Sequence, residues 1–188
     1  WDGRNASGAL VAEGPYTVKV DVRDAAGNRT VATSTVVVDR TAGTLRWSRS
    51  FYPQDGDSLA PSSAISWRQT RTAASTLGIY DATGALVRVV WTNRSLAAGV
   101  HSWTWNGKLA DGSYAPQGQY IARLDVVSPY GTQTLTRSVW AAAFRTSLSA
   151  ATVRAGQTLT VRFAAIEALR TTPRVTFTQP GLAGVTVT

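Results

Sequence analysis

Apolar and polar residues alternate along much of this chain with a period of two, the pattern typical of half-buried β-strands. From Tyr16 to Val22, every even position is apolar or aromatic and every odd position is polar. A turn sequence at 24–29 separates this run from a second one at 31–38. The pattern predicts a β-hairpin within the first forty residues.

Similar short runs follow at regular intervals, bounded by glycine-rich turns. We predict strands at 45–50, 64–70, 74–80, 86–91, 100–105, 120–126, 157–163, 172–178 and 185–188. No run of ten residues keeps the 3.6-residue period of a helix, and 163–170 is interpreted as a strand followed by a loop. Regularly spaced short strands of this kind indicate an all-β protein built from β-sandwiches.

Aromatic residues and glycines recur along the chain at one constant offset. Trp1 recurs as Trp105 and Tyr16 as Tyr120, both displaced by 104 residues (105 − 1). The glycines at 3, 8, 14 and 27 recur with the same spacing at 107, 112, 118 and 131. The match runs without a gap over about 27 positions. It therefore indicates two copies of one structural unit with a period of about 104 residues.

The repeat divides the chain into one complete domain and two partial ones. Residues 1–40 match the second half of the complete copy, which occupies 41–143, and 39–44 is predicted as the linker between them. Residues 144–188 resemble a new domain start, with apolar residues alternating after an Ala-Gly turn at 155–156. We therefore predict tandem immunoglobulin-like β-sandwiches: a C-terminal half, a complete domain and the N-terminal part of a third.

The composition supports a folded protein and narrows its chemistry. Hydrophobic residues make up 44% of the 188 and charged residues 16%, enough apolar content for packed cores. The absence of cysteine excludes disulfides, thiolate nucleophiles and cysteine-ligated zinc. No apolar stretch approaches the ~20 residues of a membrane span. The first residue is not methionine, so we interpret the chain as a piece of a longer protein.

The net charge is +8, and nearly all of the positive charge is arginine. These arginines are scattered singly and form no basic run or helical stripe, so we expect no nucleic-acid partner. The preference for arginine over lysine also fits a GC-rich genome. An anionic cell-wall polymer or a glycan stays open as a partner.

A family likeness lies in the predicted complete domain. Its motifs are IYDATGALVR at 79–88, AGVHSWTWNG at 98–107, a glycine at 112, and PQGQY at 116–120. This pattern resembles the FlgD/Vpr-type immunoglobulin-like domain, which occurs in flagellar hook-capping proteins and more often in secreted bacterial proteins. The resemblance covers 41–143 nearly end to end and 1–40 well, whereas 144–188 matches only generically.

The resemblance implies an extracellular or cell-surface location and a structural or adhesive role. It also implies that the partners are neighbouring immunoglobulin-like domains of the same or another chain. Because Vpr-type domains accompany secreted subtilisin-like proteases, an accessory domain of a secreted hydrolase or protease is an alternative.

Candidate catalytic residues are few, and we predict that the chain is not an enzyme. His101 is the only histidine, and we interpret it as a solvent-facing residue of its strand. No nucleophile elbow and no zinc-protease motif occurs. Of the eleven acids, Glu13 and Glu167 are the only glutamates. Four of the nine aspartates adjoin glycine, which is turn chemistry, so no carboxylate pair for glycoside hydrolysis is expected.

Calcium is the one cofactor that the sequence suggests, and none other is expected. Asp55 and Asp57 lie in FYPQDGDSL at 51–59, which resembles the Asn-x-Asp-Gly-Asp loops of related domains, some of which hold calcium through oxygen ligands. Gln54 stands in place of the asparagine, and few acids follow. Ordinary Asp-Gly turns are the competing interpretation.

The seven tryptophans suggest a glycan platform as a further hypothesis, since sugars stack on exposed indoles. Four of them, at 67, 91, 103 and 105, lie in predicted strands and are assigned to the core. Trp47 and Trp140 are less constrained and are therefore the candidate glycan contacts.

Three functions follow from the sequence. The first is a spacer or assembly module outside the cell, the second a glycan- or wall-binding module, and the third an accessory domain of a secreted enzyme. The two partial domains together amount to nearly one domain, so completion between chains is a further hypothesis. Truncation of a longer repeat protein explains the same observation more simply.

Overall fold

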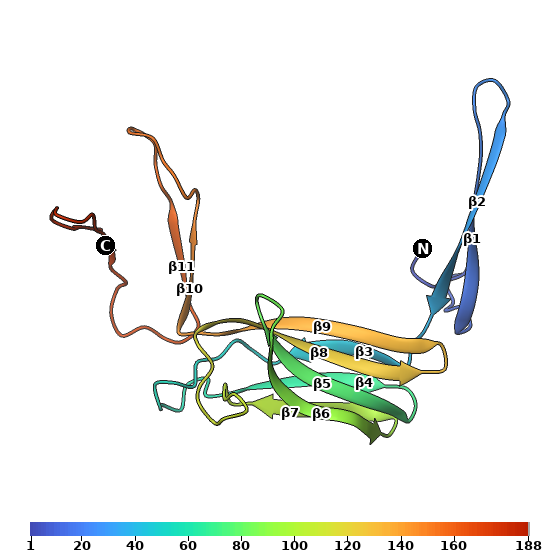
Figure 1. The fold of residues 1–188 in the computed structure, drawn as a ribbon, viewed down its shortest axis with the longest axis horizontal. Coiled ribbons are helices and arrows are strands. Elements are labelled where there is room, and N and C mark those ends of the chain that lie inside the picture. Colours follow the sequence, from blue (N-terminus) through green and yellow to red (C-terminus); the bar gives the residue numbers. More distant parts are fainter. Residues whose placement is uncertain (188) are drawn as a thin grey trace.

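The computed structural model describes residues 1–187, and every regular element among them is a β-strand (Figure 1). The predicted all-β class is thereby confirmed. The described residues include no helix long and apolar enough to cross a membrane. Residue 188, at the end of the predicted third domain, lies outside the described part of the chain.

The middle of the chain forms a two-layer sandwich. One layer is the three-stranded sheet β3-β4-β7, and the other is the four-stranded sheet β6-β5-β8-β9. All pairings within these sheets are antiparallel. The strands are β3 (Ala42–Trp47), β4 (Ser63–Gln69), β5 (Ala73–Asp81), β6 (Leu86–Leu96), β7 (Gly99–Trp105), β8 (Gly118–Ser128) and β9 (Gly131–Ala141).

The core lies between the two layers and follows the alternation of the sequence. In β4 and β8 every second side chain is buried, and the residues between them face outward. Trp105 is completely buried, with its ring centroid 5.4 Å from that of Phe51 and 5.0 Å from that of Tyr120. This edge-to-face aromatic cluster joins the two sheets at one end of the sandwich.

The first part of the chain forms a separate hairpin of β1 (Gly14–Arg23) and β2 (Arg29–Val38). In Figure 1 it projects from one end of the sandwich. The connection to the sandwich is shorter than predicted, because β3 already begins at Ala42 and only 39–41 lie between the strands.

The last part contains two short antiparallel pairs, β10 (Phe144–Leu148) with β11 (Val161–Ala165) and β12 (Val175–Phe177) with β13 (Val185–Val187). The strand predicted after the Ala-Gly turn at 155–156 begins later than expected, since 157–160 are loop residues and only 161–163 lie in β11. The strand that pairs with β11 is β10, whose three central residues are Arg, Thr and Ser and give a weak hydrophobic signal.

The interpretation of His101 as a solvent-facing residue is also wrong. Val100 is 74% exposed, whereas His101 is half-buried, with its ring centroid 5.6 Å from that of Trp67. Its Nε2 lies 2.8 Å from the carbonyl oxygen of Ala97. His101 has the same strand parity as Trp103 and Trp105, so the inward face of β7 includes it.

Candidate functional site

Local geometry is repeated almost bond for bond at positions 104 residues apart. The indole N–H of Trp1 donates to the carbonyl oxygen of Arg4 at 2.8 Å, and that of Trp105 donates to the carbonyl oxygen of Lys108 at 2.9 Å. In both copies a short antiparallel bridge closes the loop that follows. The same sequence pattern therefore produces the same turn in both places.

The tyrosine after each loop repeats a second bond. The Tyr16 hydroxyl donates to the carbonyl oxygen of Ala12 at 2.9 Å, and the Tyr120 hydroxyl donates to that of Pro116 at 2.6 Å. The tryptophan and tyrosine rings lie 5.3 Å apart in the first copy and 5.0 Å apart in the second. These bonds fix the entry of the chain into β1 and β8.

The junction between the first hairpin and the sandwich is held by side chains. The backbone N–H of Arg40 donates to Glu13 Oε1 at 2.7 Å, and the Arg40 guanidinium donates to the carbonyl oxygen of Val11 at 2.7 Å. Glu13 also forms a half-buried ion pair with Arg71, which follows β4 of the sandwich. One carboxylate thus connects the hairpin, the linker and the sandwich.

The opposite junction uses the equivalent residue. Gln117, 104 positions after Glu13, accepts a hydrogen bond on Oε1 from the backbone N–H of Ala143 at 3.1 Å. The turn between β8 and β9 holds two residues against five between β1 and β2, so the strand pairings place Ala143 where Arg40 lies. Gly27 and Gly131, although 104 apart in sequence, are therefore not structural equivalents. At both junctions, the side chain just before the hairpin, Glu13 or Gln117, accepts a backbone N–H from the segment that follows the hairpin.

The predicted calcium residues, Asp55 and Asp57, lie at the junction between the sandwich and the last segment, which is called the second junction below. Asp55 and Asp57 are exposed in the loop before β4, and each accepts a backbone N–H, from Asp57 at 3.3 Å and from Leu59 at 2.6 Å respectively. The chain after β11 brings in Glu167, and one carboxylate oxygen of each acid lies within 4.8 Å of the others. This arrangement offers three hard oxygen ligands from two segments far apart in sequence.

The electrostatics of this acidic cluster favour a cation or a proton. Oε1 of Glu167 is buried and has no hydrogen-bond partner among the described residues. Burial and then the nearby charges of Asp55 and Asp57 raise the pKa of the Glu167 carboxyl above its usual range. A divalent cation would give the Glu167 oxygen a partner and would also offset the repulsion between the three carboxylates. Sequence reasoning missed Glu167, because nothing in the pattern shows that 165–170 folds back onto the 51–60 loop.

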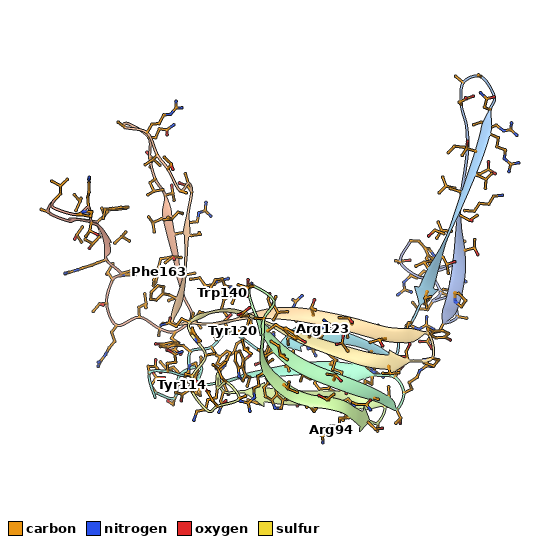
Figure 2. The ribbon with its side chains drawn as sticks, viewed as in Figure 1. Arg94, Tyr114, Tyr120, Arg123, Trp140 and Phe163 are labelled. Atoms are coloured by element: carbon orange, nitrogen blue, oxygen red, sulfur yellow. The ribbon has the colours of Figure 1, made fainter. Side chains whose placement is uncertain are left out.

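The two candidate glycan tryptophans differ in their surroundings. Trp47 donates its indole N–H to the carbonyl oxygen of Arg137 at 3.0 Å and packs against the core near Trp105. Trp140 instead lines an open groove between β9 and β10–β11, near Phe163 (Figure 2). Two arginines, Arg145 and Arg162, also line this groove. Only Trp140 is placed beside an open groove, and its neighbours there add positive charge.

Comparison with known proteins gives a family match for the centre of the chain. The family model described as FlgD Ig-like domain matches residues 54–128. Residues 54–128 thus resemble the FlgD Ig-like domain, which confirms, for this part of the chain, the resemblance stated from the sequence. A curated relative, the basal-body rod modification protein FlgD of Escherichia coli (strain K12), is 45% identical over 62 residues, which are 33% of this chain and 26% of that protein. The match therefore spans about a quarter of the relative's length.

Two solved structures overlap more loosely. Dimeric latent PorU from Porphyromonas gingivalis overlaps with a TM-score of 0.42 and 19% identity, covering 72% of this chain and 13% of that one. FlgD from P. aeruginosa overlaps with a TM-score of 0.35 and 21% identity, covering 56% of this chain and 76% of that one. Both TM-scores are below 0.5, so neither structure informs the function.

The FlgD Ig-like match has a clear position in the fold. It begins at Gln54 in the loop before β4 and ends at Ser128 with β8, so it includes Asp55, Asp57 and Gln117. It leaves out β3 and β9, the first hairpin and everything after β9. The junction residue Glu13, the cluster member Glu167, and both Trp47 and Trp140 therefore lie outside the segment that the family describes.

Proposed function

We propose that this chain is a non-catalytic spacer or assembly module of an extracellular repeat protein, built from tandem immunoglobulin-like domains divided at 1–40, 41–143 and 144–188. The observation that supports it most is the repeated junction, in which Glu13 and Gln117 each accept the N–H of the residue that leads into the next segment. A spacer needs the same rigid connection at each step.

Rigidity is the physical property that this function requires. Neighbouring domains in one chain move relative to each other by default unless the contact between them is extensive. Here the linker is only 39–41, and its backbone is held on both sides. Gln133 of β9 accepts the Ala42 N–H at 2.8 Å and donates to the Ala42 carbonyl oxygen at 2.9 Å, while the Thr70 N–H donates to the Thr41 carbonyl oxygen at 2.9 Å.

The chain lends itself to a direct measurement of this rigidity, because it contains no cysteine. Cysteines introduced at Thr35 in β2 and Thr136 in β9, both exposed, accept spin labels for a distance measurement by pulsed electron resonance. A rigid spacer gives a narrow distance distribution. Glu13→Ala removes the shared acceptor and should broaden it, whereas Asp2→Ala, an exposed acid in the same segment, should not.

A broad distribution in the parent chain would contradict the spacer function, since the junction would then be flexible with all its bonds available. A distribution that stays narrow in Glu13→Ala would show that other contacts hold the linker. The accessory-domain alternative differs in another way, because it requires a catalytic domain elsewhere in the full-length protein.

Calcium binding at the acidic cluster is a second candidate function, favoured by the convergence of Glu167 with the predicted pair. An ion held by Asp55, Asp57 and Glu167 would bind the loop before β4 to the segment after β11 and stiffen the second junction. Isothermal titration of the chain with Ca²⁺ tests it, with Glu167→Gln as the disrupting variant and Asp111→Asn, in a turn outside the cluster, as the control.

Glycan or wall-polymer binding is a third candidate function, favoured by the groove that contains Trp140, Arg145 and Arg162. An indole that shares a groove with two arginines suits an anionic polysaccharide, and such binding would weaken with salt. Co-sedimentation with purified cell walls tests it. Trp140→Ala should release the chain from the walls, and Trp47→Ala should not, because the Trp47 indole N–H already has a partner.

A further inference from the structure

The two sides of the central sandwich differ in how they are closed. On one side β3 and β9 lie next to each other and are joined by side chains. The Trp47 indole N–H donates to the carbonyl oxygen of Arg137 at 3.0 Å, and Gln133 bonds the N–H and the carbonyl oxygen of Ala42 at 2.8 and 2.9 Å. On the other side β6 and β7 end their sheets, and the described residues form no ladder between these two strands. The sandwich therefore has one closed side and one open side.

The open side consists only of strands from the central sandwich. The chain enters the sandwich at β3 and leaves it at β9, and both of these strands lie on the closed side. In Figure 1 the hairpin β1–β2 and the pair β10–β11 project away from β6 and β7. The segments before and after the sandwich are thus attached at a distance from the open side.

Of the two edge strands on the open side, β7 has the less protected edge. Proteins usually protect edge strands against pairing by bulges, charged residues or proline. β6 has an extra residue at three points along its pairing with β5, so its edge is irregular. β7 pairs with β4 from Gly99 to Trp105 without a register shift, and its sequence GVHSWTW contains no proline, lysine, arginine or acid. Alternate residues of β7 therefore present backbone N–H and C=O groups to a regular, open edge.

The sheet that contains β7 is also one strand narrower than the sheet it packs against, with three strands against four. Trp103 of β7 packs against the core but is only half-buried. Its neighbour within the sheet, Ile65 of β4, is completely buried, so the exposed part of the indole lies on the open side. A strand added beside β7 would equalise the two sheets and cover this indole.

The side chains around this edge are positive and are not paired with acids. Arg88 and Arg94 of β6 lie over indole rings, with Cζ of Arg88 5.9 Å from the Trp103 centroid and Cζ of Arg94 5.5 Å from the Trp91 centroid. Figure 2 shows Arg94 at the outer margin of the sandwich. β6 and β7 contain no acid, and within the described part of the chain neither arginine forms an ion pair. The open side is therefore complementary to negative charge.

We propose that β7 accepts an extended acidic segment of another protein as an added strand. Backbone hydrogen bonds along β7 hold the segment, and its side chains at every second position point toward β6, next to His101 and Trp103. Carboxylates at these positions pair with the guanidinium groups of Arg88 and Arg94. A second copy of this chain does not suit the edge, because a net charge of +8 opposes its approach to a positive surface. This docking goes beyond the spacer function and does not depend on the junctions.

Titration of the full chain with a synthetic peptide tests the proposal. The peptide has the seven-residue length of β7, alternates glutamate with valine and is blocked at both ends. We expect saturable binding that weakens with salt and slows hydrogen exchange of amides in β7 but not in β9. A peptide that alternates lysine with valine should not bind. The glutamate–valine peptide with every backbone nitrogen methylated keeps its charge but loses its donors, and it should bind at least about tenfold more weakly.

Two charge-reversal variants make the test specific for the open side. Arg94→Glu and Arg46→Glu change the net charge equally, and both arginines are exposed, but Arg46 lies in β3 on the closed side. Arg94→Glu should weaken binding about fivefold or more, and Arg46→Glu clearly less. Arg88 is less suitable for this comparison, because its guanidinium also donates to the carbonyl oxygens of Lys108 and Leu109 at 2.7 and 3.0 Å.

Four results would overturn the proposal. The first is the lack of saturable binding up to about 1 mM peptide, which corresponds to only about 4 kcal/mol of binding free energy. The second is equal binding of the methylated peptide, which would indicate attraction of any polyanion without strand pairing. The others are unchanged affinity in Arg94→Glu and slowed exchange outside β7 instead of within it. None of these results bears on the spacer function, since the spin-label distances at the junction test that separately.

Discussion

Residues 1–38 and 105–141 present one sequence pattern in two environments. Both copies keep the indole and tyrosine hydrogen bonds of the turn, and both continue into a long antiparallel hairpin. Their exposure is opposite: Trp1 is 70% exposed, and Trp105 is completely buried. The comparison shows that local sequence sets the turn and the strand, whereas burial depends on strands contributed from elsewhere.

The largest difference between the two copies is expected when each tryptophan is replaced in turn. Trp105→Ala should destabilise the sandwich by about 3–5 kcal/mol, the usual range for removing a fully buried large aromatic side chain. Trp1→Ala should leave the free energy of unfolding of the sandwich unchanged. Urea denaturation followed by fluorescence measures both. Equal losses would mean that Trp1 is buried in solution.

Two glycines in the turn after Trp105 differ in how closely their surroundings pack against them. Gly107 has a φ of 75°, and a Cβ there would lie 2.5 Å from Cγ of Pro53. Gly112 has a φ of 86° with open space around it. Gly112→Ala should therefore cost about 1–3 kcal/mol for the strained backbone alone, and Gly107→Ala should cost clearly more. Thermal unfolding of the two variants compares them, and equal costs would contradict the packing against Pro53.

The two copies can also be compared by removing the hydroxyl of Tyr16 or that of Tyr120. Tyr120→Phe should cost about 1 kcal/mol, because it removes a partly buried hydrogen bond from the buried Tyr120 to the carbonyl oxygen of Pro116. Tyr16→Phe should cost much less, since its bond to Ala12 is exposed to water. Denaturant midpoints of the two variants at neutral pH measure both losses of stability.

The pH dependence of Tyr120 has a definite sign. Burial, and then the charge of Asp81, raise the pKa of the Tyr120 hydroxyl above its ordinary 10.0. The unfolded chain therefore loses this proton first as the pH rises above about 10, and the sandwich loses stability there. Tyr120→Phe should remove that part of the alkaline loss of stability. An unchanged alkaline slope would contradict the burial of the hydroxyl.

The smallest expected effect concerns the acidic cluster. With its pKa raised, ionised Glu167 disfavours the folded junction at neutral pH, and protonation on acidification relieves this. Glu167→Gln should therefore slightly raise the apparent melting temperature at pH 7 without calcium and remove any response to Ca²⁺. Melting curves with Ca²⁺ and with a chelator, compared with Asp111→Asn, check this. A full calcium response in Glu167→Gln would exclude it as a ligand.

Strand positions in the sandwich followed from the sequence because one face of each strand is buried. The alternation in β4 and β8 is regular for that reason. Hydrophobic alternation did not predict strands correctly where most side chains of the strand are exposed. β10 has only exposed residues, so its pattern carries little information, and the alternation at 157–163 becomes a strand only at Val161.

The candidate sites were predictable only in part. Asp55 and Asp57 stand in a recognisable turn sequence, but Glu167 joins them through a tertiary contact that no spacing reveals. The inward position of His101 was available from its parity with Trp103 and Trp105. The contrast between Trp1 and Trp105 could not be predicted, since identical patterns are buried in one copy and exposed in the other.

The dependence of burial on strands from elsewhere in the fold can be measured by hydrogen–deuterium exchange of the intact chain, comparing the amides of 18–22 in β1 with those of 122–126 in β8. We expect strong protection of β8, which lies inside a four-stranded sheet. We expect weak protection of β1, whose apolar side chains are exposed and which pairs only with β2 among the described residues. Protection of β1 equal to that of β8 would contradict this dependence.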